Sequence, residues 1–124
     1  MGARPQPIEP ARTRTWFATA LSGVAVLVLV TVHMVANHFV LKQIGGLRTY
    51  AQVLQYIGNP WIFSIEAVFL VMVTWHAMLG LRSVLRDLNL RGWLGRVAER
   101  GPMVLGALTV AYGLTLILIL AARA

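Results

Sequence analysis

The sequence predicts an all-α integral membrane protein with three transmembrane helices in a single domain, residues 1–124. The chain is 58% hydrophobic and only 12% charged, whereas soluble domains carry about a quarter charged residues. Charged residues are absent from 15–41 and 101–122, and Glu66 is the only one in 49–81. Each of these stretches exceeds the roughly 20 residues that a helix needs to cross about 30 Å of hydrocarbon.

The first half of the chain contains an arm, a transmembrane helix and a short interfacial helix. Residues 1–15 hold three prolines and scattered arginines, which predict an irregular cytoplasmic arm. The first transmembrane helix is expected over 16–41, where Trp16 and Phe17 suit an aromatic membrane-interface anchor. Two glycines then interrupt the chain, and 49–57 is expected to form a short interfacial helix.

The second half contains the other two transmembrane helices. Asn59-Pro60 is a helix-start signal for the second helix, expected over 60–88. A loop is predicted over 89–100, and proline opens the third helix, expected over 102–122. The third helix carries glycine but no buried charge or histidine, which indicates a structural span whose small residues let helices approach closely.

The net charge of +7 reflects topology, because the basic residues sit just outside the apolar spans. Positive residues concentrate on the cytoplasmic side of membrane proteins. The arm and the second loop together hold eight of the eleven basic residues: Arg4, Arg12, Arg14, Arg82, Arg86, Arg91, Arg96 and Arg100. We therefore expect a multi-pass protein of a bacterial or archaeal cytoplasmic membrane, with the N-terminus inside, the C-terminus outside and no nucleic-acid partner.

Four ionisable residues lie within or near the apolar spans: His33, His38, Glu66 and His76. Such groups cost several kcal/mol in hydrocarbon unless they are paired or ligated. A membrane histidine is either an interhelical hydrogen-bonding group or a ligand or relay, and the residue alone leaves both interpretations open. The chain has no cysteine, so thiolate and iron–sulfur ligation within it are excluded.

His76 is the strongest candidate ligand. Gly80 lies one turn further on nearly the same face, where it leaves room for a flat group, and Asp87 returns to that stripe eleven residues on. Arg82 and Arg86 sit beside the stripe, where haem propionates would pair with them. A neutral imidazole whose second nitrogen is hydrogen-bonded is a good axial ligand for haem iron.

The stretch from Trp75 to Asp87, with His-Ala, a Gly four residues after the His and an Asp eleven after it, resembles the second-helix motif of succinate dehydrogenase membrane anchor subunits. Ser22-Gly23 in the first helix is similar to a second motif of that family. The resemblance covers roughly residues 16–90. Leu88 departs from it, because many relatives have a quinone-contacting Tyr after the Asp.

The resemblance implies a haem b-binding bundle formed with a second membrane anchor subunit, beside an iron–sulfur subunit and a flavoprotein subunit. Electrons from succinate would pass through these to quinone, or in reverse from quinone to fumarate. By this likeness His76 is an axial haem ligand. Arg82, Arg86, Asp87 and Ser22 would then lie near the haem propionates or the quinone.

His33 and His76 are expected at different depths in the membrane. At 1.5 Å per residue, His33 and His76 differ by about 12 Å in depth, too far to share one iron. His33 is therefore either a ligand for a second, outer haem or a buried hydrogen-bonding group. His38 is about 140° around the helix from His33 and nearer the interface, and its role stays open. Glu66 is either part of a proton relay or a protonated structural carboxyl.

Two other classes of protein remain to be weighed. One is a small proton-coupled transporter that uses Glu66 and the histidines, although no inverted repeat is visible. The other is a haem-free structural membrane protein that assembles through small-residue faces. The sequence shows no Gly-rich nucleotide loop and no nucleophile–base pair that would indicate a soluble catalytic site.

Overall fold

The computed structural model describes residue 2 and residues 10–45 and 49–124. The described residues form four helices and no strand: α1 (Pro10–Ile44), α2 (Tyr50–Ile57), α3 (Pro60–Asp87) and α4 (Gly92–Ala122). Three stretches are long and apolar enough to cross a membrane, namely Thr13–Phe39, Pro60–Asp87 and Gly92–Ala122. The predicted fold class is therefore confirmed.

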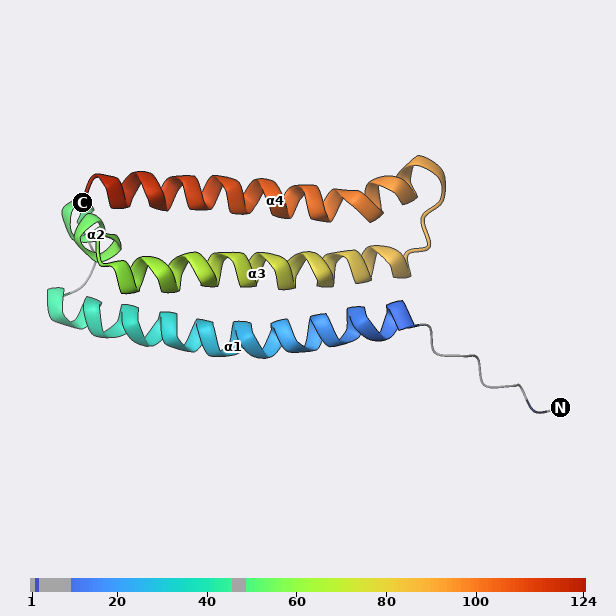
Figure 1. The fold of residues 1–124 in the computed structure, drawn as a ribbon, viewed down its shortest axis with the longest axis horizontal. Helices are drawn as coiled ribbons and strands as arrows, with labels where there is room; N and C mark the ends of the chain where they lie inside the picture. Colours follow the sequence, from blue (N-terminus) through green and yellow to red (C-terminus); the bar gives the residue numbers. More distant parts are fainter. Residues whose placement is uncertain (1, 3–9, 46–48) are drawn as a thin grey trace.

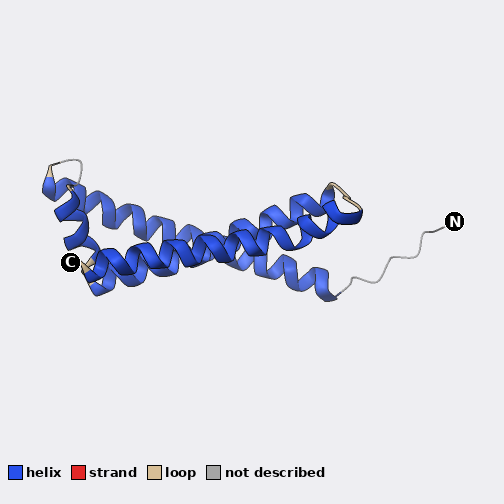
Figure 2. Ribbon diagram, turned by 90° about the horizontal axis from the view of Figure 1, so that it is seen from above, coloured by secondary structure: helices blue, strands red, loops and turns tan. Residues whose placement is uncertain are grey.

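The three long helices form a single layer with α3 in the middle (Figure 1). Helix α3 packs against α1 on one side and α4 on the other, whereas the described residues of α1 and α4 do not contact each other. Seen from above, α1 crosses the α3–α4 pair obliquely (Figure 2). Short α2 lies across one end of the layer, near the C-terminus, and contacts α3 and α4.

Helix α1 is longer than the predicted 16–41. It begins at Pro10, so residues 10–15 are helical where an irregular arm is expected. The first turn of a helix tolerates proline, because the N–H that proline lacks has no partner there. Residues 1 and 3–9 of the arm lie outside the described residues, as do 46–48.

Helix α4 starts at Gly92, ten residues before the predicted start at Pro102. The predicted loop over 89–100 shrinks to a short turn, in which Asn89 adopts a positive φ of 50°. Proline inside a helix removes one backbone hydrogen bond, here the one to the carbonyl of Ala98. The residues before Pro102 gain more backbone hydrogen bonds by continuing the helix than the proline removes.

Helices α2 and α3 each begin with a side-chain cap, and the sequence predicts the one at Asn59-Pro60. Thr49 caps α2 in a reciprocal capping box: its backbone N–H donates to Gln52 Oε1 at 2.7 Å, and the Gln52 N–H donates to Thr49 Oγ1 at 3.4 Å. The Asn59 side chain accepts from the N–H of Trp61 at 3.0 Å, with Pro60 in the first turn of α3. Helix α3 ends at Asp87, within one residue of its predicted end.

Glycines on α4 bring it close to α3. A Cβ added at Gly106 would lie 2.6 Å from Met78 Cγ, and one added at Gly113 would lie 2.5 Å from Leu70 Cδ2. Such close approach is how small residues drive helix association in lipid. The outward surfaces are strongly apolar, with Tyr112 73% and Trp61 80% exposed. These surfaces suit contact with lipid or with another membrane subunit.

Candidate functional site

His76 projects from α3 toward α1, where Ser22 meets it. The distance from His76 Nδ1 to Ser22 Oγ is 3.0 Å, and Ser22 is buried. Ser22 Oγ also donates to the carbonyl oxygen of Thr19 at 3.0 Å. A hydroxyl has one proton, so both contacts are satisfied together only when Nδ1–H of His76 donates to Ser22. That tautomer leaves a lone pair on His76 Nε2.

The surroundings of His76 suit a ligand histidine. No described residue forms a hydrogen bond with its Nε2. A Cβ added at Gly23 would lie 3.2 Å from His76 Cε1, so the absence of a side chain at Gly23 lets the ring approach the α1 backbone. One turn beyond His76, a Cβ added at Gly80 would meet nothing within 4 Å. The open side of Gly80 agrees with the expectation that a flat group fits there.

The two arginines after His76 pair with an acidic residue that the sequence interpretation missed. Arg82 donates to Glu99 on α4, and Arg86 Nη2 donates to Glu99 Oε1 at 2.8 Å. Both guanidinium groups are thus held on the α4 side of α3, away from the α1 side that His76 faces. Asp87 is exposed. The sequence signal for this ion pair was available, because Glu99 is the only acidic residue in 88–124.

A second polar cluster joins α1, α2 and α3 near the α2 end of the layer. His33 Nδ1 lies 2.9 Å from Glu66 Oε1, and the Tyr56 hydroxyl donates to the same oxygen at 3.1 Å. Asn37 donates to the carbonyl oxygen of His33 at 2.8 Å, and the Phe69 ring stacks on the imidazole at 5.0 Å between centroids. The imidazole, the carboxyl group, the phenol and the amide of this cluster therefore each take part in at least one polar contact, as groups in hydrocarbon require.

The two clusters lie at different levels between α1 and α3. Ser22 and His33 are about 16 Å apart along α1, and Glu66 and His76 about 15 Å apart along α3, at 1.5 Å per residue. His33 and His76 thus cannot bind one iron together. His38 is exposed, and its described ring contact is an edge contact with Phe39 at 5.8 Å. It takes part in neither cluster.

The described residues contain no group of three or more His, Asp or Glu side chains that would hold a metal ion alone. The arrangement instead offers single imidazoles at two levels, each with Nδ1 fixed by a neighbour. Haem iron needs only one such imidazole from each side, and ligand histidines are typically oriented through their second nitrogen. His76 is therefore the residue that would hold haem iron at this site, with Nε2 as the donor atom.

An apolar groove of about 400 Å³ lies between α3 and α4. It is lined by residues that include Thr74, Trp75, Met78 and Gly106, and His76 does not line it. Since His76 faces α1, the groove is separate from the His76 site.

Comparison with known proteins gives one consistent result. The family model described as succinate dehydrogenase/fumarate reductase transmembrane subunit matches residues 4–120. A succinate dehydrogenase hydrophobic membrane anchor subunit of Thermoplasma acidophilum is 26% identical over 105 residues, covering 85% of this chain and 84% of the relative. One of Archaeoglobus fulgidus is 32% identical over 74 residues, covering 60% of this chain and 61% of the relative. No solved structure matches significantly.

Proposed function

Because the chain belongs to the succinate dehydrogenase/fumarate reductase transmembrane subunit family, we propose that it is a haem b-binding anchor of a succinate:quinone oxidoreductase. In this role it pairs with a companion anchor in the bilayer and docks the iron–sulfur and flavoprotein subunits. It also helps electrons reach quinone. The basic end of the layer, where α1 starts and α4 begins, would face the cytoplasm under the positive-inside rule.

The observation that carries the haem assignment is the His76–Ser22 contact. Ser22 accepts from Nδ1–H at 3.0 Å, which fixes the tautomer and orients the ring. His76 Nε2 is then the atom that would hold the iron, and Gly80 would admit the edge of the macrocycle. Haem b, when bound, supplies a one-electron redox centre within the bilayer.

For the propionates and the quinone, the chain offers fewer groups than the sequence motif suggests. Arg82 donates to Glu99 through Nη2, and Arg86 does so through Nε and Nη2. The buried Nε–H of Arg82 has no hydrogen-bond partner in the described part of the chain. A buried donor without a partner costs about 1–3 kcal/mol, so this N–H suits a carboxylate or carbonyl of a bound group. Asp87 and Ser22 complete the set that this chain would contribute near the quinone.

The experiment is purification in mild detergent, followed by a reduced-minus-oxidised spectrum, a haem-to-protein ratio and identification of the co-purifying subunits. We expect His76→Gln to remove one haem per chain while the assembly persists. Ser22→Ala should weaken haem binding about 10- to 100-fold, because orienting partners of metal ligands have effects of that size. His38→Gln, outside both clusters, is the matched control and should leave the ratio unchanged.

An unchanged haem content in His76→Gln would refute the ligand assignment. Absence of any haem, flavoprotein and iron–sulfur protein from the preparation would refute the proposed function as a whole. It would favour a transporter or a haem-free structural protein instead.

The His33 cluster supports a second candidate role at the opposite level. A histidine whose Nδ1 is bound by a carboxylate is a common form of metal ligand, so His33 would hold an outer haem. A His–Glu–Tyr chain is equally suited to moving protons. Two outcomes separate these roles: loss of one of two haems in His33→Gln supports the outer haem, and unchanged haem with slower turnover in Glu66→Gln supports the relay.

A further inference from the structure

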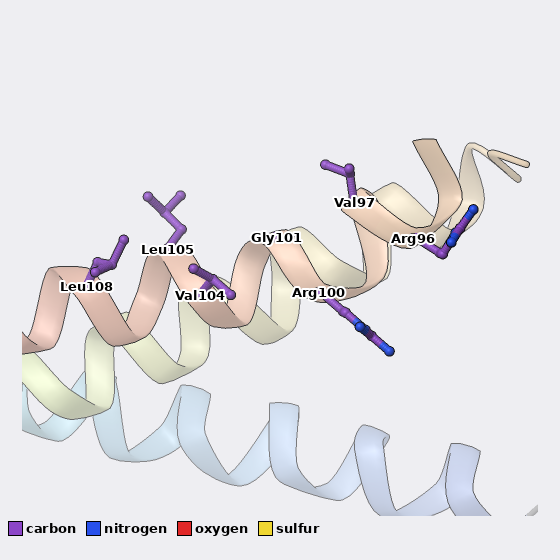
Figure 3. A pocket seen from close by; sticks show the side chains of 7 residues that line it. All are labelled: Arg96, Val97, Arg100, Gly101, Val104, Leu105 and Leu108. Carbon is purple, nitrogen blue, oxygen red and sulfur yellow. The ribbon is translucent and has the colours of Figure 1, made fainter. Parts of the chain in front are cut away.

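The side of α4 that faces away from α3 carries a shallow groove of about 500 Å³ (Figure 3). Two arginines, Arg96 and Arg100, lie at one end of it, and aliphatic side chains continue along the same stripe of the helix. The bottom of the groove is at Gly101, where an added Cβ would meet only Val97 Cγ1, at 3.8 Å. The groove therefore has a cationic end, an apolar end and a notch between them.

The position of the groove along α4 matches the boundary of the hydrocarbon layer. The 22 uncharged residues 101–122 span about 33 Å, the thickness of the hydrocarbon core. Arg100 therefore lies at the boundary, and Arg96 lies one turn, about 6 Å, further out. The headgroup layer is about 5–7 Å thick on each side. Both guanidinium groups are thus at phosphate level, and the aliphatic part of the groove is at acyl-chain level.

The charge of the two arginines is not neutralised by the described part of the chain. Glu99, which lies between them in sequence, points to the other side of α4 and is bound by Arg82 and Arg86. Arg96 and Arg100 are exposed and form no ion pair within the described residues. An anion bound here would meet two free guanidinium groups.

We propose that this groove binds an acidic phospholipid of the adjacent leaflet. The phosphate is held by Arg96 and Arg100, and one acyl chain lies over Gly101 and along Val104, Leu105 and Leu108. A lipid matches both ends of the groove, since it carries an anion at the depth of the arginines and hydrocarbon at the depth of the aliphatic residues. Basic residues beside a membrane helix attract acidic lipids by roughly fivefold in affinity per residue.

The test uses the purified full chain with its co-purifying subunits. The assembly is delipidated in mild detergent, and binding of phosphatidylglycerol and phosphatidylcholine is then titrated by native mass spectrometry. The double variant R96Q/R100Q should bind phosphatidylglycerol about thirtyfold more weakly, with phosphatidylcholine binding unchanged. Gly101→Leu, which fills the notch without changing charge, should weaken phosphatidylglycerol binding as well.

Arg91→Gln is the matched control, because Arg91 lies at the same end of α4, is exposed and does not line the groove. Arg91 lies five residues, about 8 Å, further out than Arg96, beyond the headgroup layer, so Arg91→Gln should weaken phosphatidylglycerol binding much less than the roughly fivefold expected for each groove arginine. Equal weakening by Arg91→Gln would mean that overall surface charge attracts the lipid, which overturns the proposal. Loss of a co-purifying subunit from R96Q/R100Q with lipid binding intact would assign the groove to a protein partner and also overturn it. Helix content by circular dichroism identifies any variant that fails to fold, and Gly101→Leu tests the groove independently of charge.

Discussion

Substitution of Gly113 by alanine tests whether the α3–α4 contact depends on the absence of a side chain. The added Cβ would lie 2.5 Å from Leu70 Cδ2, 3.3 Å from Cδ1 and 3.5 Å from Cγ. Ordinary contacts begin near 3.4 Å, so Leu70 must retreat by about 0.9 Å. The clashing atoms are the end of the Leu70 side chain, so Leu70 has to change rotamer or lean away, and in either case it loses packing against α4.

The magnitude follows from two opposing effects. Overpacking of a close contact costs roughly 1–3 kcal/mol, and replacing glycine by alanine within a helix returns up to about 1 kcal/mol. We expect Gly113→Ala to lower the free energy of unfolding by about 1–2 kcal/mol. In the Leu70→Ala background the same substitution should be neutral or stabilising, which gives a coupling energy of at least about 1 kcal/mol.

The assay is an SDS titration of the purified chain in mild detergent, followed by circular dichroism, with Gly101→Ala as the control. Gly101 is on the outer face of the same helix, and its added Cβ meets only one atom, at 3.8 Å. If Gly113→Ala unfolds at the same SDS fraction as Gly101→Ala, the steric reasoning fails. It also fails if the Leu70→Ala background does not relieve the effect.

Two further substitutions test the polar contacts between helices. Tyr56→Phe removes the 3.1 Å hydrogen bond to Glu66 and should lower the free energy of unfolding by about 0.6 kcal/mol, and by no more than about 1.7. A larger loss in the same SDS titration would mean that Tyr56 does more than donate to Glu66. Glu99→Gln removes the charge that joins α3 to α4 and should cost about 1 kcal/mol or less, since the Glu99 side chain is 44% exposed. Added salt should lower the free energy of unfolding of the unsubstituted protein until it approaches that of Glu99→Gln. If salt lowers the free energy of unfolding of both proteins equally, the ion pair does not contribute.

The features that the sequence predicts well are those set by neighbouring residues. The apolar spans require only length and composition, and Asn59 acts on the backbone two or three residues away. The separate depths of His33 and His76 follow from counting residues at a fixed rise. Each of these features depends on positions counted along a single helix and not on how the helices pack against one another.

The features that the sequence leaves open depend on how helices rotate against one another. Glu99 is seventeen residues from Arg82, and its pairing requires α4 to extend back beyond Pro102. Likewise, Tyr56 reaches Glu66 only because α2 lies across the end of the layer. Considered alone, Pro102 predicts the start of a helix. Residues 92–101 nevertheless form helical turns before it, because the backbone hydrogen bonds of these turns outnumber the one that the proline removes.

The arrangement of the long helices in one layer has a consequence for the order of assembly. Trp75 and Ala77 flank His76 in sequence, lie about 160° apart around α3, and are both exposed. Both sides of α3 next to His76 are therefore open in the part of the chain that the structure describes. A layer one helix thick has two faces and no interior, so it cannot enclose a bound group. Under the proposed function, a group bound beside His76 would be enclosed only once a second protein closes over it, so loading of that group would be a late step of assembly.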